Sequence, residues 1–299
     1  MRFPIVQLEF THALGPPAGR YTVREDAPSG NGAAPGAAGS ADVLVIQVEG
    51  APPARRRLLR SRVRAAKPGA TPAEVPIVVA TLVKGTSALA GRADGDALLA
   101  ELHDGGSRAE QWVAEGLAVV NRAITAYRLC AGDPHAVGVT RQDARTVRVG
   151  YGTGELVFHG SWEQAIEVPP PRAPKVKREV SLMPQQGVAA VLSAGAPLLE
   201  AEELILRAGL DLEQGLERAA AVGLRAGLDL LRGELRDQDL SPGARRRLEE
   251  AEAGAGELAE LASRATDGVF APGDRARLEL AVKRLGGVVD AWRYQPPDA

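Results

Sequence analysis

Hydrophobic and polar residues alternate along several short stretches in the first half of the chain. Residues 5–11 place Val6, Leu8 and Phe10 on one side and polar side chains on the other. This is the pattern of a strand with one buried face. A turn rich in glycine and proline follows, so we predict that residues 20–25 return as the second arm of a hairpin.

Later stretches of the first half also have the pattern of strands. Residues 43–49 alternate in the same way, whereas residues 77–83 are apolar on both faces, as expected in the middle of a sheet. Residues 146–151 and 155–159 predict two more strands, joined by a Gly-Thr-Gly turn. Together these segments predict a mostly antiparallel or mixed sheet.

Residues 107–127 predict one long helix that covers this sheet. Ser107 can cap the first turn, and Glu110, three residues later, completes a capping box. Apolar residues then recur at spacings of three and four up to Tyr127, which is the stripe of a helix lying on a sheet. The preceding residues 101–106 contain Glu, His and Asp but end in two glycines, so we predict a solvated loop there.

The second half of the chain predicts only helices. Residues 169–177 are rich in proline, which excludes both a helix and a central strand. We therefore predict a β-rich α+β domain over residues 1–168, a linker over 169–183 and an antiparallel α-helical bundle over 184–299.

Prolines and glycines indicate where the helices of this bundle begin and break. Pro184 suits the first turn of a short helix. Residues 198–235 predict a long helical stretch that can break near Gly209. Ser241, followed by a proline, and Pro272 mark the starts of two further helices.

The composition says more about the cellular compartment of the protein than about its function. Cys130 is the one cysteine, so a disulfide within the chain is impossible, and a reducing compartment fits. The N-terminus lacks the apolar core of a secretory signal, and the most apolar stretch, residues 75–83, is far shorter than the roughly 20 residues of a membrane span. We expect a soluble cytoplasmic protein without membrane contact. Its preference for arginine over lysine, with abundant alanine and glycine, is typical of GC-rich bacterial coding sequences.

A basic segment stands out because it contains no acidic residue. It can neutralise several phosphates of a nucleic acid, although it has no aromatic side chain for stacking on bases. The net charge of −2 gives no general attraction to nucleic acid. We favour a solvated loop and keep nucleic-acid binding as an alternative. The basic residues are Arg55, Arg56, Arg57, Arg60, Arg62, Arg64 and Lys67.

Glycines cluster at Gly150, Gly152 and Gly154, but their spacing does not match a dinucleotide-binding motif. Glu155 would also repel a phosphate, so we favour a turn between strands and predict no cofactor. Trp162 follows shortly afterwards. It can anchor a ligand or partner, but we favour a role in covering the open end of the sheet.

Reactive residues are few and scattered. Cys130 lies near Asp133 and His135, and a Cys–His pair can activate a thiolate nucleophile. Because Pro134 indicates a turn there, we favour packing at a helix end. The other histidines have no His or Cys partner at the spacing of metal ligands, so we predict no metal site.

A stripe of mostly small residues runs along the predicted long helix. Ala219, Gly223, Gly227 and Leu231 are four residues apart. Because glycine inside a helix costs about 1 kcal/mol relative to alanine, such a stripe indicates that another backbone comes close. Packing within one bundle explains it, and so does an interface with a second chain.

Three functional hypotheses follow. The leading one is a non-enzymatic binding or assembly module that contacts itself or another protein through its helical domain. The first alternative is a nucleic-acid-associated protein that uses the Arg55–Lys67 segment. The second is an enzyme with a site between sheet and bundle, for which Glu155, His159 and Asp133 are candidate residues and no reaction is predicted.

Overall fold

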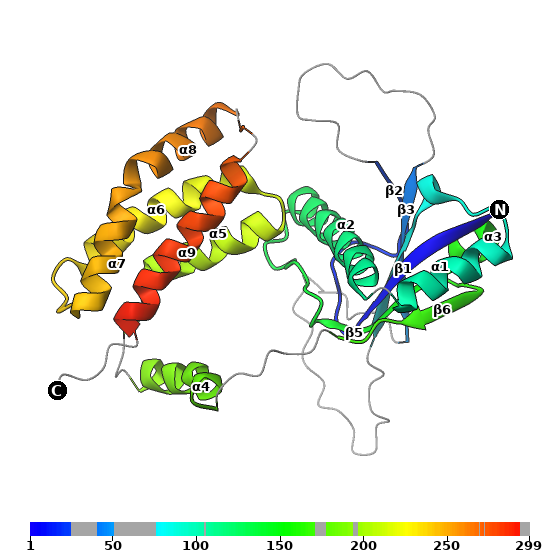
Figure 1. Cartoon of the computed structure of the whole chain (residues 1–299), viewed down its shortest axis with the longest axis horizontal. Coiled ribbons are helices and arrows are strands. Elements are labelled where there is room, and N and C mark those ends of the chain that lie inside the picture. The colour runs from blue at the N-terminus through cyan, green and yellow to red at the C-terminus, as the bar shows by residue number, and fades with distance from the viewer. Residues whose placement is uncertain are drawn as a thin grey trace, which may run out of the picture. The chain divides into compact units, whose positions relative to one another are not determined.

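The chain has an α+β fold with two compact units, as the computed structural model in Figure 1 shows. Unit 1 spans Met1–Arg172 and contains the sheet, and unit 2 spans Ala173–Ala299 and is helical. The predicted fold class is therefore confirmed. The structure describes residues 1–24, 41–50, 76–104, 106–170, 178–193, 197–268, 270–271 and 273–293.

The sheet of unit 1 has six strands in the order β2-β3-β4-β1-β5-β6, and all neighbouring strands are antiparallel. The first strand of the chain therefore lies in the middle, between β4 and β5. The hairpin predicted from residues 5–11 and 20–25 is wrong, because β2 pairs with β3 and not with β1. The strands are β1 (Arg2–Phe10), β2 (Gly19–Val23), β3 (Asp42–Glu49), β4 (Ile77–Val83), β5 (Ala144–Thr153) and β6 (Gln164–Glu167).

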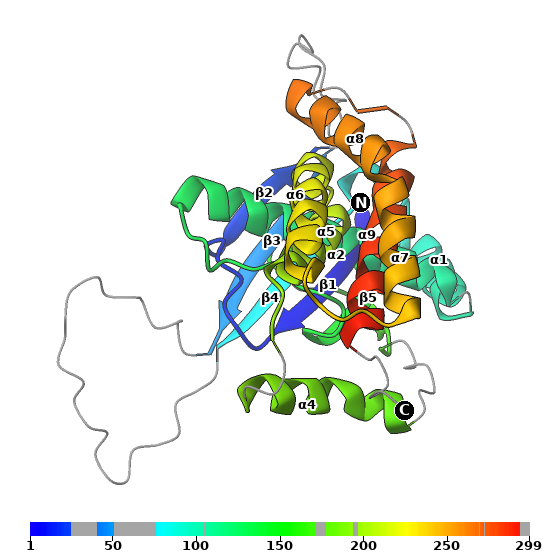
Figure 2. The same cartoon turned by 90° about the vertical axis from the view of Figure 1, so that its left-hand side faces the viewer.

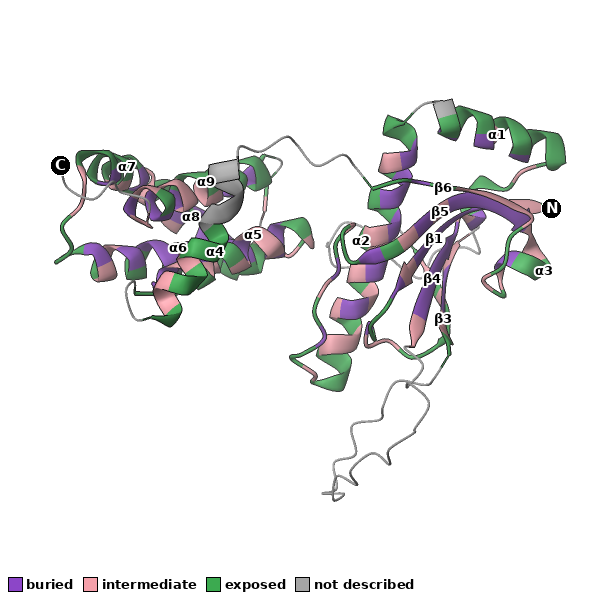
Figure 3. Ribbon diagram, turned by 90° about the horizontal axis from the view of Figure 1, so that it is seen from below, coloured by how far each residue is buried: buried purple, intermediate pink, exposed green. Residues whose placement is uncertain are grey.

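Two helices cover the first face of this sheet. α2 (Ser107–Ala131) packs Val113, Val120 and Ile124 against the apolar face of β1, and α1 (Arg92–Asp104) adds Leu102 to the same core. Figure 3 shows the buried side of α2 turned toward the strands. The amphipathic stripe of α2 confirms the predicted long helix. A short 3-10 helix (Gly85–Ser87) links β4 to this pair.

The start of α2 differs from the sequence prediction. Gly106 is the N-cap residue and makes no side-chain hydrogen bond to the helix, so the predicted capping box of Ser107 and Glu110 is wrong. Residues 101–104, predicted to belong to a loop, form the end of α1 instead. Gly95 inside α1 lowers helix propensity, but a Cβ there would come within 2.6 Å of the Tyr151 ring. Packing against the sheet therefore outweighs the local preference.

The second face is covered by residues that were predicted to be a strand. After β5 the chain forms a short helix, α3 (Gly154–Val157), and then returns as β6. Val157 is fully buried with Ile5, Val45 and Val83 on this face. A Cβ at Gly152 would lie 3.0 Å from Val157 Cγ1 and 3.1 Å from the backbone nitrogen of Glu163. The clustered glycines thus allow the chain to fold back closely over β5, and the predicted strand over 155–159 is wrong.

Unit 2 contains six helices in its described residues. Helices α5 to α9 share one apolar core that includes Leu224, Leu228 and Leu285. α9 packs between α5 and α7, as Figure 2 shows. The helices are α4 (Arg178–Leu192), α5 (Glu200–Glu213), α6 (Glu217–Leu235), α7 (Pro242–Ala253), α8 (Ala255–Asp267) and α9 (Asp274–Arg293). Within the described residues, none of the helices is long and apolar enough to cross a membrane.

The helix boundaries of unit 2 agree only in part with those predicted from the sequence. The side chain of Ser241 accepts a hydrogen bond from the backbone nitrogen of Ala244, which confirms the predicted start of α7. The long helical stretch breaks between α5 and α6, where Gly215 has a φ of 74°, and not at Gly209. Pro184 lies inside α4 rather than in its first turn.

Gly223 and Gly227 of α6 face α5 in the same unit. A Cβ at Gly227 would lie 3.3 Å from Ile205 Cγ1 and 3.5 Å from Leu204 Cβ. A Cβ at Gly223 would lie 3.6 Å from the Cβ of Ala208. Packing within the bundle therefore accounts for these two glycines, because a larger side chain would push the two helices apart.

We predict that Gly227→Leu lowers the free energy of unfolding of unit 2 by about 1–3 kcal/mol, the usual cost of overpacking a close contact. Gly233→Leu on the same helix is the matched control, since a Cβ at Gly233 meets no atom within 4 Å. The control should be neutral or gain up to about 1 kcal/mol from helix propensity. Chemical denaturation measures both. Unchanged stability of Gly227→Leu, together with loss of an oligomer in light scattering, would favour an intermolecular interface instead.

Candidate functional site

A polar hollow lies on the second face of the sheet in unit 1. Its volume is about 380 Å³, and residues from four strands and the loop after α3 line it. The alternation of side chains along β1 places Gln7 and Glu9 on the face opposite α2. The register places Gln7 beside Thr81 of β4 and Arg148 of β5. The lining residues are Gln7, Glu9, Glu49, Val79, Arg148, Gly160, Ser161 and Trp162.

The amide of Gln7 is the centre of this site. Gln7 is only 4% exposed, and its Nε2 donates to Thr81 Oγ1 at 3.1 Å and to the Gly160 carbonyl at 2.8 Å. Its Oε1 accepts from Trp162 Nε1 at 3.3 Å and from Arg148 Nη1 at 3.5 Å. A buried amide whose hydrogen bonds were not satisfied would destabilise the fold. The network therefore fixes the positions of all its members.

Charge in the hollow is unevenly balanced. Arg148 forms an ion pair with Glu9, and both side chains are largely covered. Glu49 at the end of β3 is exposed and forms no ion pair with any described residue. Two carboxylates therefore face one guanidinium, which leaves the lining with a net negative charge. The indole of Trp162 is 39% exposed at the same hollow.

The loop that carries Trp162 is attached to the sheet at several points. Gln7 binds the Gly160 carbonyl at 2.8 Å, and Gln47 Nε2 donates to the His159 carbonyl at 3.0 Å. The ring of His159 lies 3.2 Å from Arg20 Nη2, measured to Nδ1. Gly160 has a φ of 67°, and a Cβ there would come within 1.8 Å of Gln47 Oε1. Glycine is thus required both by the backbone conformation and by the space available.

A second polar cluster joins α1 to β5 on the other face. The buried Tyr151 hydroxyl donates to Asp96. With its amide oriented to satisfy both neighbours, Gln164 donates to Asp96 Oδ1 and accepts from Arg92 Nη2, each at 3.0 Å. Burial, followed by the hydrogen bond to Asp96, raises the pKa of Tyr151 above its usual value. This cluster links α1 to β5 and β6.

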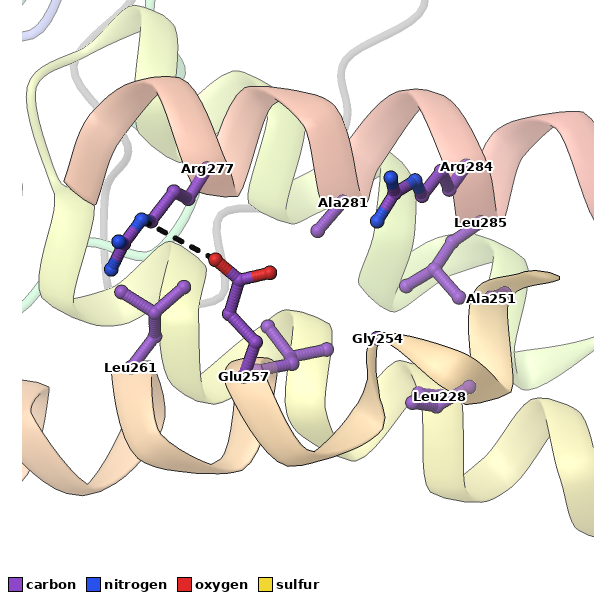
Figure 4. A pocket seen from close by; sticks show the side chains of 10 residues that line it. Leu228, Ala251, Gly254, Glu257, Leu261, Arg277, Ala281, Arg284 and Leu285 are labelled. Atoms are coloured by element: carbon purple, nitrogen blue, oxygen red, sulfur yellow. Dashed lines mark ion pairs between the residues drawn. The ribbon is translucent and has the colours of Figure 1, made fainter. Parts of the chain in front are cut away.

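Two other hollows are less suited to orient a polar ligand. A cavity of about 470 Å³ between β2 and α2 is mainly apolar, with Tyr21, Leu44 and Val119 in its lining. The bundle of unit 2 contains a gap of about 20 Å³ above Leu228, beside the ion pair of Glu257 with Arg277 at 3.3 Å (Figure 4). This gap has room for about one water molecule.

The candidates from the sequence do not form a reactive set. Cys130 is exposed at the end of α2, and Asp133 Oδ1 accepts from the backbone nitrogen of His135 at 3.0 Å, which shapes the turn. Glu155 and His159 are exposed around α3. Among the residues that the structure describes, His, Cys, Asp and Glu form no group able to hold a metal ion.

The structure describes one of the two predicted sets of binding residues, the stripe on α6, but not the basic segment. The basic segment Arg55–Lys67 lies outside the described residues, so nucleic-acid binding there stays a prediction. In the α6 stripe, Gly227 and Leu231 are buried, Gly223 is half-buried and Ala219 is exposed.

Comparisons with protein-family models, curated proteins and solved structures gave no match for this chain.

Sequence reasoning found one residue of the polar hollow and missed the others. The sequence offers Trp162 as a candidate ligand anchor, but its alternating pattern places Gln7 and Glu9 on the solvent side of a half-buried strand. The missing information was the central position of β1, which places Gln7 under a covering loop. The sequence signal for that cover was the glycine cluster at 150–154, which was interpreted as a hairpin turn.

We predict that Gly160→Ala lowers the free energy of unfolding by about 1–2 kcal/mol more than Gly132→Ala. Both glycines have a similar φ, 67° and 61°, so both variants share the strain of a left-handed backbone. Only Gly160→Ala must also displace Gln47 and its hydrogen bond to the His159 carbonyl, since a Cβ at Gly132 meets no atom within 4 Å. Urea denaturation checks this, and equal losses would show that the loop does not depend on Gln47.

We predict that ionisation of Tyr151 destabilises the protein at alkaline pH. Its pKa is raised in the folded state, so its stabilising effect is complete below the unfolded value of about 10 and is lost as pH rises through the folded value. The melting temperature should therefore fall less steeply above about pH 10 in Tyr151→Phe than in the unmodified protein. Parallel curves would contradict the prediction.

Proposed function

We propose that this protein is a binding module that holds a positively charged group in the polar hollow of unit 1. The observation that carries the proposal is the fully bonded, buried amide of Gln7 beneath a half-exposed indole. Polar groups that are already fixed before binding lose little conformational entropy when a ligand arrives. Such preorganisation is typical of a recognition site.

The charge of the lining supports a cationic ligand. Glu49 has no ion-pair partner among the described residues, and Glu9 already forms an ion pair with Arg148. An ammonium or guanidinium group can pair with Glu49 and stack on the exposed face of Trp162, which adds roughly 0.5–1 kcal/mol at a partly exposed site. An anionic group would meet the repulsion of both carboxylates.

The assembly hypothesis has a separate observation in its favour. Ala219, Val222, Ala226 and Leu230 are exposed on α6, and the exposed fractions of Val222 and Leu230 are 47% and 38%. An apolar stripe of this kind on a helix favours contact with a second protein surface. We keep helix-mediated assembly as the second candidate function. Light scattering of the unmodified chain tests it.

Binding of a cation should change the fluorescence of Trp162. Trp112 and Trp292 are each only 8% exposed, whereas Trp162 is 39% exposed at the hollow. We expect titration with methylguanidinium or agmatine at low salt to give a saturable change in emission that is absent in Trp162→Phe. Glu49→Gln should weaken binding about two- to fivefold, which corresponds to one partly exposed ion pair.

Glu155→Gln is the matched control, because it removes an exposed carboxylate from the same unit outside the hollow. It should leave the dissociation constant unchanged. A signal that does not saturate, or that weakens equally in both glutamine variants, would reject a specific cation site. A saturable response to acetate instead of the cations would contradict the proposed charge of the ligand.

A further inference from the structure

A further hollow, with a charge opposite to that of the hollow in unit 1, lies in unit 2. It has a volume of about 150 Å³ and is lined by Arg247 and Glu250 of α7 and by Lys283 and Arg284 of α9. α7 and α9 pack side by side along this part of the bundle. Glu250 already pairs with Arg246 at 3.4 Å, on the same helix. Three cationic groups therefore face one carboxylate that is shared with another arginine.

These three cations differ from most basic residues of unit 2. Arginines elsewhere in the unit are paired with carboxylates, among them Arg207, Arg225, Arg264, Arg275 and Arg293. Arg247, Lys283 and Arg284 form no ion pair with any described residue, although unit 2 has more acidic than basic residues. Like charges that gather without partners repel one another, and a bound anion relieves that repulsion.

The backbone of α9 makes room for this arrangement. A Cβ at Gly287 would lie 2.9 Å from Arg247 Nη1, so the guanidinium of Arg247 lies directly on α9. Gly287 is one helical turn from both Lys283 and Arg284. On the other side, Figure 4 shows Arg284 projecting from α9 near Gly254, where a Cβ would lie 3.5 Å from Arg284 Nη1. Alanine at Gly287 would displace one of the three cations without changing the charge.

We propose that this hollow binds the phosphoryl group of a small phosphorylated ligand. Guanidinium groups offer paired donors that match phosphate oxygens, and the ammonium of Lys283 adds a compact charge. The volume of about 150 Å³ is suited to one small group rather than to a polymer surface. The acidic excess of unit 2 also disfavours a long polyanion such as a nucleic acid, whose binding needs a continuous basic surface.

Isothermal titration calorimetry of the full chain at low salt tests the proposal, with pyrophosphate and inorganic phosphate as probes. We expect saturable binding of pyrophosphate, weaker binding of phosphate, and a loss of affinity of at least tenfold in Lys283→Gln/Arg284→Gln. The control Arg236→Gln/Arg245→Gln also removes two exposed arginines of unit 2 that form no ion pair with a described residue, but outside the hollow. It should change the affinity less than twofold.

Gly287→Ala provides a test that leaves every charge in place. It should weaken pyrophosphate binding several-fold while thermal melts show no loss of stability, because alanine is the better helix former. Absence of binding at millimolar pyrophosphate, or equal losses in the two glutamine double variants, would overturn the proposal. Binding of a DNA duplex that depends on Lys283 and Arg284, without binding of pyrophosphate, would also overturn it.

Discussion

The burial of both faces of β1 imposes the main constraint on unit 1, because Val6 and Leu8 on one face and Ile5 and Gln7 on the other are all removed from water. Helices α1 and α2 cover the first face with a broad apolar core. Among the described residues, α3 and the following loop cover the second face, and the apolar cluster there is small and ends at Gln7. Beyond that point, the described residues on this face are mostly polar. The candidate site therefore lies at the edge of the apolar cluster.

The buried amide of Gln7 determines how the loop that carries Gly160 and Trp162 is positioned. Gln7 needs partners for both donors and for its acceptor, because burial removes it from water. Thr81, the Gly160 carbonyl and Trp162 supply them. In satisfying Gln7, the loop also fixes the indole beside Glu9 and Glu49. Because the buried amide of Gln7 must have all its hydrogen bonds, the polar side chains around it are held in fixed orientations at the surface.

The sequence predicted the class of fold and most elements because their signals are local. Alternation in residues 5–11, the apolar run in 77–83 and the stripe after Ser107 each reflect one buried face. Strand order is not local, and nothing in the sequence of residues 19–23 shows that they pair with β3 instead of β1. The candidate site was missed for the same reason. The burial of Gln7 depends on a loop more than 150 residues away in the sequence.

Glycines were the signals that local reasoning interpreted least well, and they lie beside both proposed sites. In isolation, a glycine suggests a turn or a helix break, because those are the conformations that it favours. Gly152 and Gly287 instead provide space, one for the backbone of a covering loop and the other for a guanidinium on a helix. Where a Cβ is absent, polar groups from distant segments can come together against the backbone. Gly152 in β5 and Gly287 in α9 therefore mark places where two segments meet, and such meetings bring the groups of the two candidate sites together.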